Sequence, residues 1–148
     1  MKFSILSTFI LWLAINTSQF EYRDLVGDWQ LVYFDGIERV KSSPEYQTRG
    51  PEFRNGIEAK IKFRLENTVY KFKTGDLLEY TDFVKQTVVL KQAKIEIEQG
   101  NIITIHEDSS SKKAKIIELN EDKMVLRPIS EKAGAGDLVF ERIKNKKK

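Results

Sequence analysis

The sequence predicts an all-β fold, an antiparallel up-and-down β-barrel of about eight strands. Short segments in which apolar and polar residues alternate follow one another along most of the chain, and glycine, asparagine or aspartate marks many of the turns between them. No strongly amphipathic helical segment interrupts the series. A sheet of this size closes most easily on itself, because closure removes its unpaired edges.

The start of the chain, residues 1–19, predicts a cleavable export signal. Lys2 supplies a positive charge, residues 3–15 are mostly apolar, and small or polar residues follow. The apolar run is shorter than the roughly 20 residues that a membrane-spanning helix needs. We therefore expect no stable membrane insertion after cleavage; the alternative is a retained N-terminal anchor.

Cleavage after Ser18 or Gln19 leaves one predicted domain over residues 20–143 and a lysine-rich tail over residues 144–148. The domain is long enough to bury a core. The net charge of +3 depends on that tail and on Lys2, so the domain itself is slightly acidic. No basic face interleaved with aromatic residues accompanies the tail, and we expect no nucleic-acid partner.

The chain contains no cysteine. This excludes disulfides, thiolate chemistry, cysteine metal sites and a lipid anchor of the lipoprotein type. An exported domain without disulfides is typical of bacteria, so the sequence predicts a periplasmic or secreted bacterial protein.

The first strand begins within residues 25–32, where Gly27 and Trp29 lie two positions apart. Trp29 is too large to leave in water, because burying such a side chain removes about 150–250 Å² from solvent. Gly27 has no Cβ, which lets the chain turn sharply or pass close to another backbone.

The next segment, residues 35–56, breaks the strand pattern with prolines, glycines and several charges. We expect a long loop over one mouth of the barrel, with a helical turn near residues 43–47. Such a loop is either a functional lid or an ordinary insertion. Residues 57–65 then alternate apolar and charged side chains, which predicts a half-buried strand.

The remaining strands follow from the same alternation and from the turns between them. The predicted strands cover residues 68–73, 83–91, 93–98, 102–106, 114–119, 124–127 and 137–143. The predicted turns and loops cover residues 74–76, 99–101, 108–111, 120–122 and 129–136. Pro128 is expected to end the strand before it.

One set of side chains along these strands is expected to face inward. It comprises Ile57, Ala59, Ile61, Phe63, Leu65, Tyr70, Phe72, Ala93, Ile95, Ile97, Met124, Leu126, Leu138 and Phe140. Of these, Phe63, Tyr70, Phe72 and Phe140 are the aromatic residues predicted to line a ligand pocket. An eight-stranded barrel is just wide enough to be filled by side chains or to hold one small ligand, and the sequence leaves both alternatives open.

Arg142 shares the inward face of the last strand with Leu138 and Phe140. An isolated buried guanidinium is costly, so it needs a partner. Arg142 either stacks on Trp29, a cation–π contact worth about 1–2 kcal/mol, or binds a ligand carboxylate. Arg127, on the opposite face of its strand, is a weaker candidate for the second role.

The sequence predicts no catalytic residue, no metal site and no cofactor. His106 is the only histidine, and neighbouring strand residues point to opposite faces, so it does not converge with Glu107. A metal site needs several ligands, and no serine–histidine–acid set can be assembled with confidence around one histidine at a strand edge. Glu96 and Glu98 are expected on the wet face rather than in a protected cleft.

The Gly27-Asp28-Trp29 step, the series of strands and the closing Phe140-Glu141-Arg142 together resemble the calycin superfamily. The chain looks most like bacterial lipocalin-like domains that follow a signal sequence. In lipocalins the tryptophan packs across the barrel base and an arginine from a late strand lies over it. The resemblance therefore implies that Gly27, Trp29 and Arg142 close one end of the barrel. The disulfide cysteines of many secreted lipocalins are absent.

The opening strand and the chain length also resemble the intracellular fatty-acid-binding proteins. Those proteins carry a helix pair after the first strand, for which residues 35–56 are a poor match. Phe140 also stands where their binding tyrosine would fall, although Arg142 matches their arginine. The predicted export signal argues further against that family.

We therefore expect an exported, non-catalytic, lipocalin-like protein that binds or carries a small hydrophobic or amphipathic molecule. The alternative is a filled barrel that acts through residues 35–56 and 129–136 as a protein-interaction or envelope-inhibitor module. Catalysis on a bound lipid-like substrate is a third hypothesis, which no constellation of residues supports.

Overall fold

The computed structural model describes residues 19–85, 87–130 and 136–144. Except for Gln19, the predicted export signal lies outside these residues. Most of the predicted loop over residues 129–136 and of the predicted basic tail lies outside them too.

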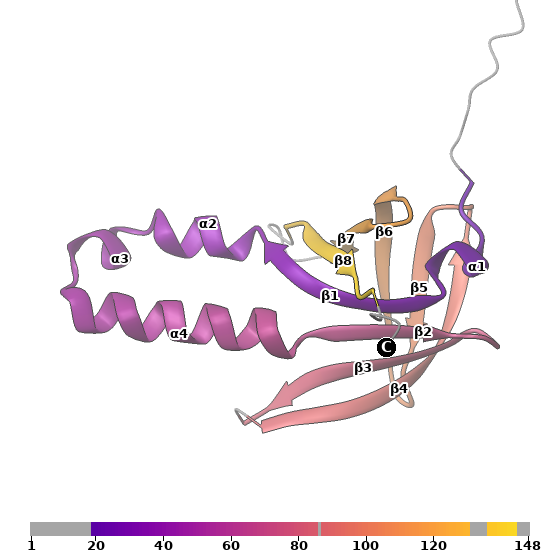
Figure 1. The fold of residues 1–148 in the computed structure, drawn as a ribbon, viewed down its shortest axis with the longest axis horizontal. Helices are drawn as coiled ribbons and strands as arrows, with labels where there is room; N and C mark the ends of the chain where they lie inside the picture. The colour runs from indigo at the N-terminus through magenta and orange to yellow at the C-terminus, as the bar shows by residue number, and fades with distance from the viewer. Residues whose placement is uncertain (1–18, 86, 131–135, 145–148) are drawn as a thin grey trace, which may run out of the picture.

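The described chain forms a closed barrel of eight antiparallel strands, in which each strand pairs with the next and the last pairs with the first (Figure 1). This confirms the predicted fold class. The strands are β1 (Gly27–Phe34), β2 (Val69–Lys73), β3 (Leu77–Val84), β4 (Thr87–Glu98), β5 (Ile102–His106), β6 (Ser111–Leu119), β7 (Lys123–Ile129) and β8 (Leu138–Arg142).

The prediction of a loop over residues 35–56 is wrong, because helices fill this segment. The helices of the chain are α1 (Tyr22–Leu25), α2 (Gly36–Lys41), α3 (Pro44–Thr48) and α4 (Pro51–Asn67). The helical turn expected near residues 43–47 is α3, where the Ser43 side chain accepts a hydrogen bond from the Tyr46 N–H at 3.2 Å. Helices therefore do follow the first strand, which removes one argument against the fatty-acid-binding likeness.

The predicted strand over residues 57–65 is also wrong, because these residues form the second half of α4. The helix begins with Pro51 at its first position, after the extended Gly50. Ile57, Ile61 and Leu65 recur every fourth residue, so they form one stripe of the helix and are half-buried. The same three positions also satisfy a period of two, which made the sequence pattern ambiguous.

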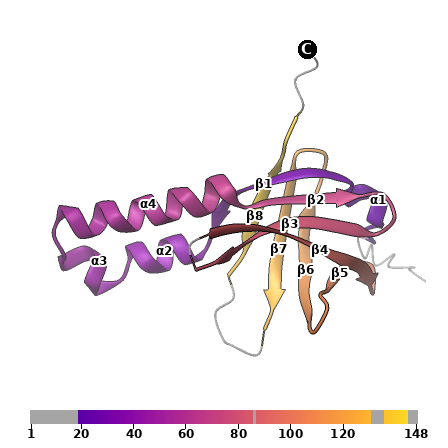
Figure 2. The same ribbon diagram turned by 90° about the horizontal axis from the view of Figure 1, so that it is seen from below.

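The helices α2, α3 and α4 project together from one end of the barrel, and we call them the helical arm (Figures 1 and 2). No residue of α4 is buried. Within the arm, the Glu58 carboxylate accepts a hydrogen bond from Tyr46 Oη at 2.6 Å and pairs with Lys41 Nζ at 3.1 Å. The arm is therefore held by these polar contacts together with the buried Ile37 and the half-buried stripe of α4.

The predicted strand over residues 83–91 is in fact a hairpin. β3 ends at Val84 and β4 begins at Thr87, with Lys85 at a φ of 49° in the turn. β3 was not predicted over most of its length, because no glycine or asparagine marks this turn. β5 pairs with β4 only from Lys94 onward, so the β3–β4 hairpin extends beyond its neighbour.

Pro128 lies within β7 and does not end it. It pairs with Ala114 of β6, whereas β7 pairs with β8 only as far as Leu126. The proline thus occupies a stretch with a partner on one side, where it is tolerated.

The end of the barrel opposite the helical arm is closed by α1, and we call it the closed end (Figure 1). The Leu25 carbonyl accepts a hydrogen bond from Trp29 Nε1 at 2.8 Å, and both side chains are fully buried. Both ends of the described chain are fixed here. The Phe20 N–H donates to the Gly100 carbonyl at 2.7 Å, and the Ile143 N–H donates to the Asp28 carbonyl at 2.8 Å.

The barrel interior holds a continuous apolar core. Its buried members are Leu25, Trp29, Leu31, Phe72, Leu78, Tyr80, Ala93, Ile95, Ile103, Ala114, Ile116, Met124, Leu126 and Phe140. Six of the fourteen inward residues that the sequence predicted are in this core: Phe72, Ala93, Ile95, Met124, Leu126 and Phe140. Side chains thus fill the closed end, and a cavity among the described residues lies towards the arm.

Candidate functional site at the barrel mouth

Arg142 lies over the Trp29 ring, with its Cζ 4.1 Å from the ring centroid, which is the first of the two roles that the sequence left open for it. Its N–H groups donate to backbone carbonyls of Glu121 at 2.6 Å, Val26 at 2.6 Å and Asp24 at 3.2 Å. These bonds occupy the guanidinium at the closed end, so we do not include it in the candidate ligand site.

Gly27 is required by this arrangement. Its φ is 137°, and a Cβ at this position would overlap Arg142 Nη1. The Gly-x-Trp step therefore keeps space for the arginine that stacks on the tryptophan.

The predicted pocket aromatics divide into three groups. Phe72 is 2% exposed and packs in the core. Phe63 does not line the interior: it lies on α4 and is 42% exposed, because residues 57–65 are helical. Tyr70 and Phe140 line a cavity at the end of the barrel from which the arm projects, which we call the mouth.

The mouth cavity has a volume of about 120 Å³. It is lined by Leu31, Arg64, Thr68, Tyr70, Tyr80, Thr81, Asp82, Phe83, Lys112, Leu138 and Phe140. Ligand pockets are commonly about 300–1,000 Å³, so this cavity holds a small group and not a whole ligand.

A larger groove adjoins the mouth cavity outside the barrel, between α4 and the end of β3. Its volume is about 640 Å³, and it is lined by Ala59, Lys60, Phe63, Arg64 and Phe83. The Phe63 and Phe83 rings lie 5.8 Å apart. Arg64 and Phe83 line both spaces, so the groove and the cavity meet at these two residues.

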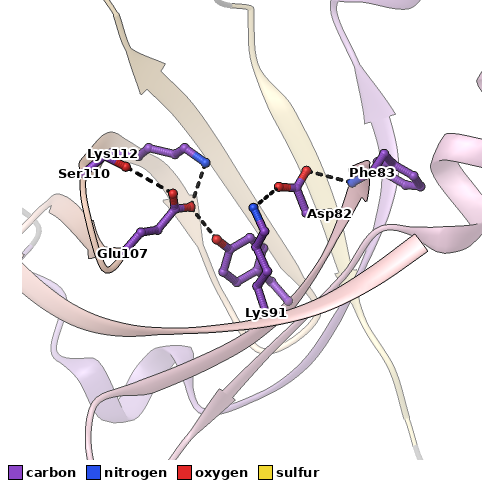
Figure 3. A network of polar contacts seen from close by, with 7 residues as sticks. Asp82, Phe83, Lys91, Glu107, Ser110 and Lys112 are labelled. Carbon is purple, nitrogen blue, oxygen red and sulfur yellow. Dashed lines mark hydrogen bonds and ion pairs between the residues drawn. The ribbon is translucent and has the colours of Figure 1, made fainter. Parts of the chain in front are cut away.

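Two acidic side chains at the mouth are neutralised by lysines (Figure 3). Glu107 accepts hydrogen bonds from Lys112 Nζ at 2.7 Å and from Tyr80 Oη, and these bonds lower the pKa of Glu107. Asp82 accepts from Lys91 Nζ at 2.6 Å, which lowers the pKa of Asp82. Burial, followed by the bond to Glu107, strongly raises the pKa of Tyr80.

Tyr70 and Arg64 are the polar side chains of the cavity that have no hydrogen bond or ion pair to a described residue. The Tyr70 ring packs 4.9 Å from Phe140 and 5.8 Å from Tyr80, and burial raises the pKa of Tyr70. Its hydroxyl makes no hydrogen bond to any described residue, yet it is not sealed from solvent. The Arg64 guanidinium stacks on Phe34, with 4.5 Å from its Cζ to the ring centroid. No described carboxylate lies within ion-pair distance of it.

A serine, a histidine and a glutamate, which the sequence alone did not bring together, form a hydrogen-bonded row. His106 Nδ1 lies 3.1 Å from Ser111 Oγ, and His106 Nε2 lies 3.2 Å from Glu96 Oε2. Only the register of β4, β5 and β6 shows this, because His106 lies directly opposite Ser111 across the strand pair. The row lies on the outer face of the barrel, where the His106 and Glu96 side chains are 43% and 62% exposed, so water reaches it.

Within the described part of the chain, no group of three or more potential ligand side chains could hold a metal ion. None of the described helices is long and apolar enough to span a bilayer. No protein-family model matches the chain, and no curated protein matches its sequence. The calycin likeness therefore stays a prediction.

Proposed function

We propose that this protein binds a small amphipathic molecule at the mouth of the barrel without converting it chemically. The observation that carries the proposal is the meeting of the mouth cavity and the groove at Arg64 and Phe83. One space is small and rimmed by polar groups, and the other is wider and has aromatic walls. Such a pair fits a ligand with a polar head and an apolar body.

The filled core decides where the ligand's body lies. Leu25, Trp29 and Phe72 are 0–2% exposed and leave little space in the closed half of the barrel. The body of the ligand therefore lies in the groove, against Phe63 and Phe83, and only its head enters the barrel. This differs from a ligand enclosed at the barrel centre.

The likeness to lipocalin-like domains and the predicted export signal complete the proposal. An exported carrier of the calycin type, periplasmic or secreted from a bacterium, agrees with the closed up-and-down barrel and the absence of cysteine.

The first experiment is mass spectrometry of small molecules released by denaturing the protein after gentle purification. A stoichiometric amphipathic compound supports a carrier and identifies its ligand. In parallel, binding of the neutral dye Nile red is measured on Phe63→Ala, with Phe53→Ala on the same helix as the matched control. We expect the first variant alone to weaken dye binding; equal binding by both variants, with no released compound, contradicts the proposal.

A second candidate function is a protein-interaction module, and the β3–β4 hairpin favours it. Val84, Val88 and Leu90 are 47%, 37% and 67% exposed there. No described strand pairs with the second edge of β4 before Lys94, and an open edge of this kind accepts an extended chain. Cross-linking in envelope extract, compared between the natural chain and Leu90→Lys, tests it; identical cross-linked partners count against the hairpin.

A further inference from the structure

Among the described charges around the mouth cavity, one cation has no carboxylate partner. Lys91 pairs with Asp82 and Lys112 pairs with Glu107, so these four charges cancel. Arg64 has no described carboxylate within reach. The groove lining adds Lys60 and contains no acidic residue, so the combined site has a net positive charge.

Arg64 is held in a geometry that suits an anion. The Arg64 guanidinium packs on the Phe34 ring and donates no hydrogen bond to a described residue, so its N–H groups are available to a ligand. A guanidinium edge presents a fork of donors that matches the two oxygens of a carboxylate.

Tyr70 supplies a second donor in the same cavity. Burial raises the pKa of its hydroxyl, with the charge of Asp82 as the next cause, so the hydroxyl keeps its proton at neutral pH. The hydroxyl has no hydrogen-bond partner among the described residues and is open to the cavity, so a ligand or water supplies its acceptor.

We infer that the ligand carries a single carboxylate, and that the Arg64 guanidinium and the Tyr70 hydroxyl bind it together at the mouth. This inference rests on the proposed function. The apolar chain of the ligand then extends from the cavity along Phe63 and Phe83. A monoanion fits better than a dianion, because one unpaired cation faces the cavity and Asp82 and Glu107 border it.

The size of the cavity agrees with this assignment. A liquid water molecule occupies about 30 Å³, so a volume of about 120 Å³ holds a carboxylate with a few carbon atoms and no bulky head.

The test uses the chain without its first 19 residues and three probes that share one alkyl chain: decanoate, decanol and decyl phosphate. Binding is measured by isothermal titration at neutral pH. We expect decanoate to bind at least about tenfold more tightly than decanol, because only the carboxylate engages the guanidinium. Decyl phosphate is expected to bind more weakly than decanoate.

Substitution of each proposed donor tests whether it binds the carboxylate. Arg64→Gln should weaken decanoate binding by about tenfold or more and leave decanol binding unchanged. Tyr70→Phe should weaken decanoate binding about threefold to tenfold. Arg54→Gln, an exposed arginine on the same helix, is the matched control and should change nothing.

Two results overturn the inference while leaving the proposed function intact. In the first, decanoate and decanol bind equally well, and this binding is weakened by Phe63→Ala but not by Arg64→Gln. The other is decyl phosphate as the tightest probe, which would make the head group a phosphate. Failure of all three probes together with unchanged Nile red binding in Phe63→Ala contradicts the proposed function itself.

Discussion

At the scale of single residues, a substitution of Gly27 tests whether the closed end needs a residue without a side chain at this position. Gly27→Ala should lower the free energy of unfolding by about 2 kcal/mol or more, because alanine is strained at positive φ and its Cβ overlaps the Arg142 guanidinium. Urea unfolding followed by circular dichroism measures this.

Gly75→Ala is the control that separates strain from overlap. Gly75 also has a positive φ, of 85°, but a Cβ there meets nothing within 4 Å. Gly75→Ala should lower the free energy of unfolding by about 1 kcal/mol. Equal losses in the two variants would show that Arg142 plays no part in the requirement for Gly27.

Arg142 itself should matter for stability and not for ligand binding. Arg142→Met removes the cation over Trp29 and the donors to three carbonyls, and we expect a loss of about 2–4 kcal/mol in urea unfolding. Arg127→Met, which removes an exposed pair with Asp137, should cost about 1 kcal/mol or less. Unchanged stability in Arg142→Met would refute the structural role.

The contact between Trp29 and Arg142 was foreseen as one of two roles for Arg142, from its inward position on the last strand and from the resemblance to lipocalins. Tyr70 was assigned to a ligand from its place on an inward face, and it does line the mouth cavity. Arg64 was missed, because its segment was read as a strand with the charged residues outside. Only the contact between α4 and β1 places its guanidinium over Phe34.

At the scale of elements, α4 shows how one spacing satisfies two periods. Ile57, Ile61 and Leu65 fit a strand face and a helix stripe alike, so alternation alone did not separate the two. The proline at the first helical position and the length of 17 residues carry the information that favours a helix. The hairpin turn at Lys85 was missed for a different reason, since a lysine at positive φ leaves no mark in the sequence.

The helical arm should open more readily than the barrel. No residue of α4 is buried, so few apolar contacts oppose local unfolding. In hydrogen-exchange mass spectrometry we expect amides of residues 51–67 to exchange faster than those of β3, β6 and β7. Equal protection would mean that the arm and the barrel unfold as one unit.

The polar contacts at the mouth should make stability depend on pH at both extremes. The pKa values of Glu107 and Asp82 are lowered by folding, so their contribution is present above about pH 4 and is lost as the pH falls through the lower folded values. The pKa of Tyr80 is raised by folding. Its contribution is therefore complete below about pH 10 and is lost as the pH rises towards the folded value.

Urea unfolding across the pH range measures both effects. Glu107→Gln should flatten the acid side of the profile, and Tyr80→Phe should reduce the alkaline side. If the stability of Tyr80→Phe depends on pH above pH 10 as that of the natural protein does, the alkaline effect does not come from Tyr80.

At the scale of the whole molecule, closure of the barrel was predictable. A sheet of about eight strands joined by short turns has few other ways to pair the backbone N–H and C=O groups of its edge strands. Whether the barrel is hollow was not predictable. Cavity volume depends on how side chains from all eight strands meet, and here Leu25, Trp29 and Phe72 fill the closed half. The groove was equally hidden from the sequence, because it joins residues of α4 to the end of β3.

Both ends of the described chain are fastened at the closed end, at Gly100 and at Asp28. A tether attached through either terminus therefore leaves the barrel on the side away from the mouth, and the molecule presents its open side outward from whatever surface holds it. Protein immobilised through its first or its last residue should bind decanoate with the same affinity on a sensor chip. Attachment through a cysteine placed at Lys60, beside the groove, should block that binding.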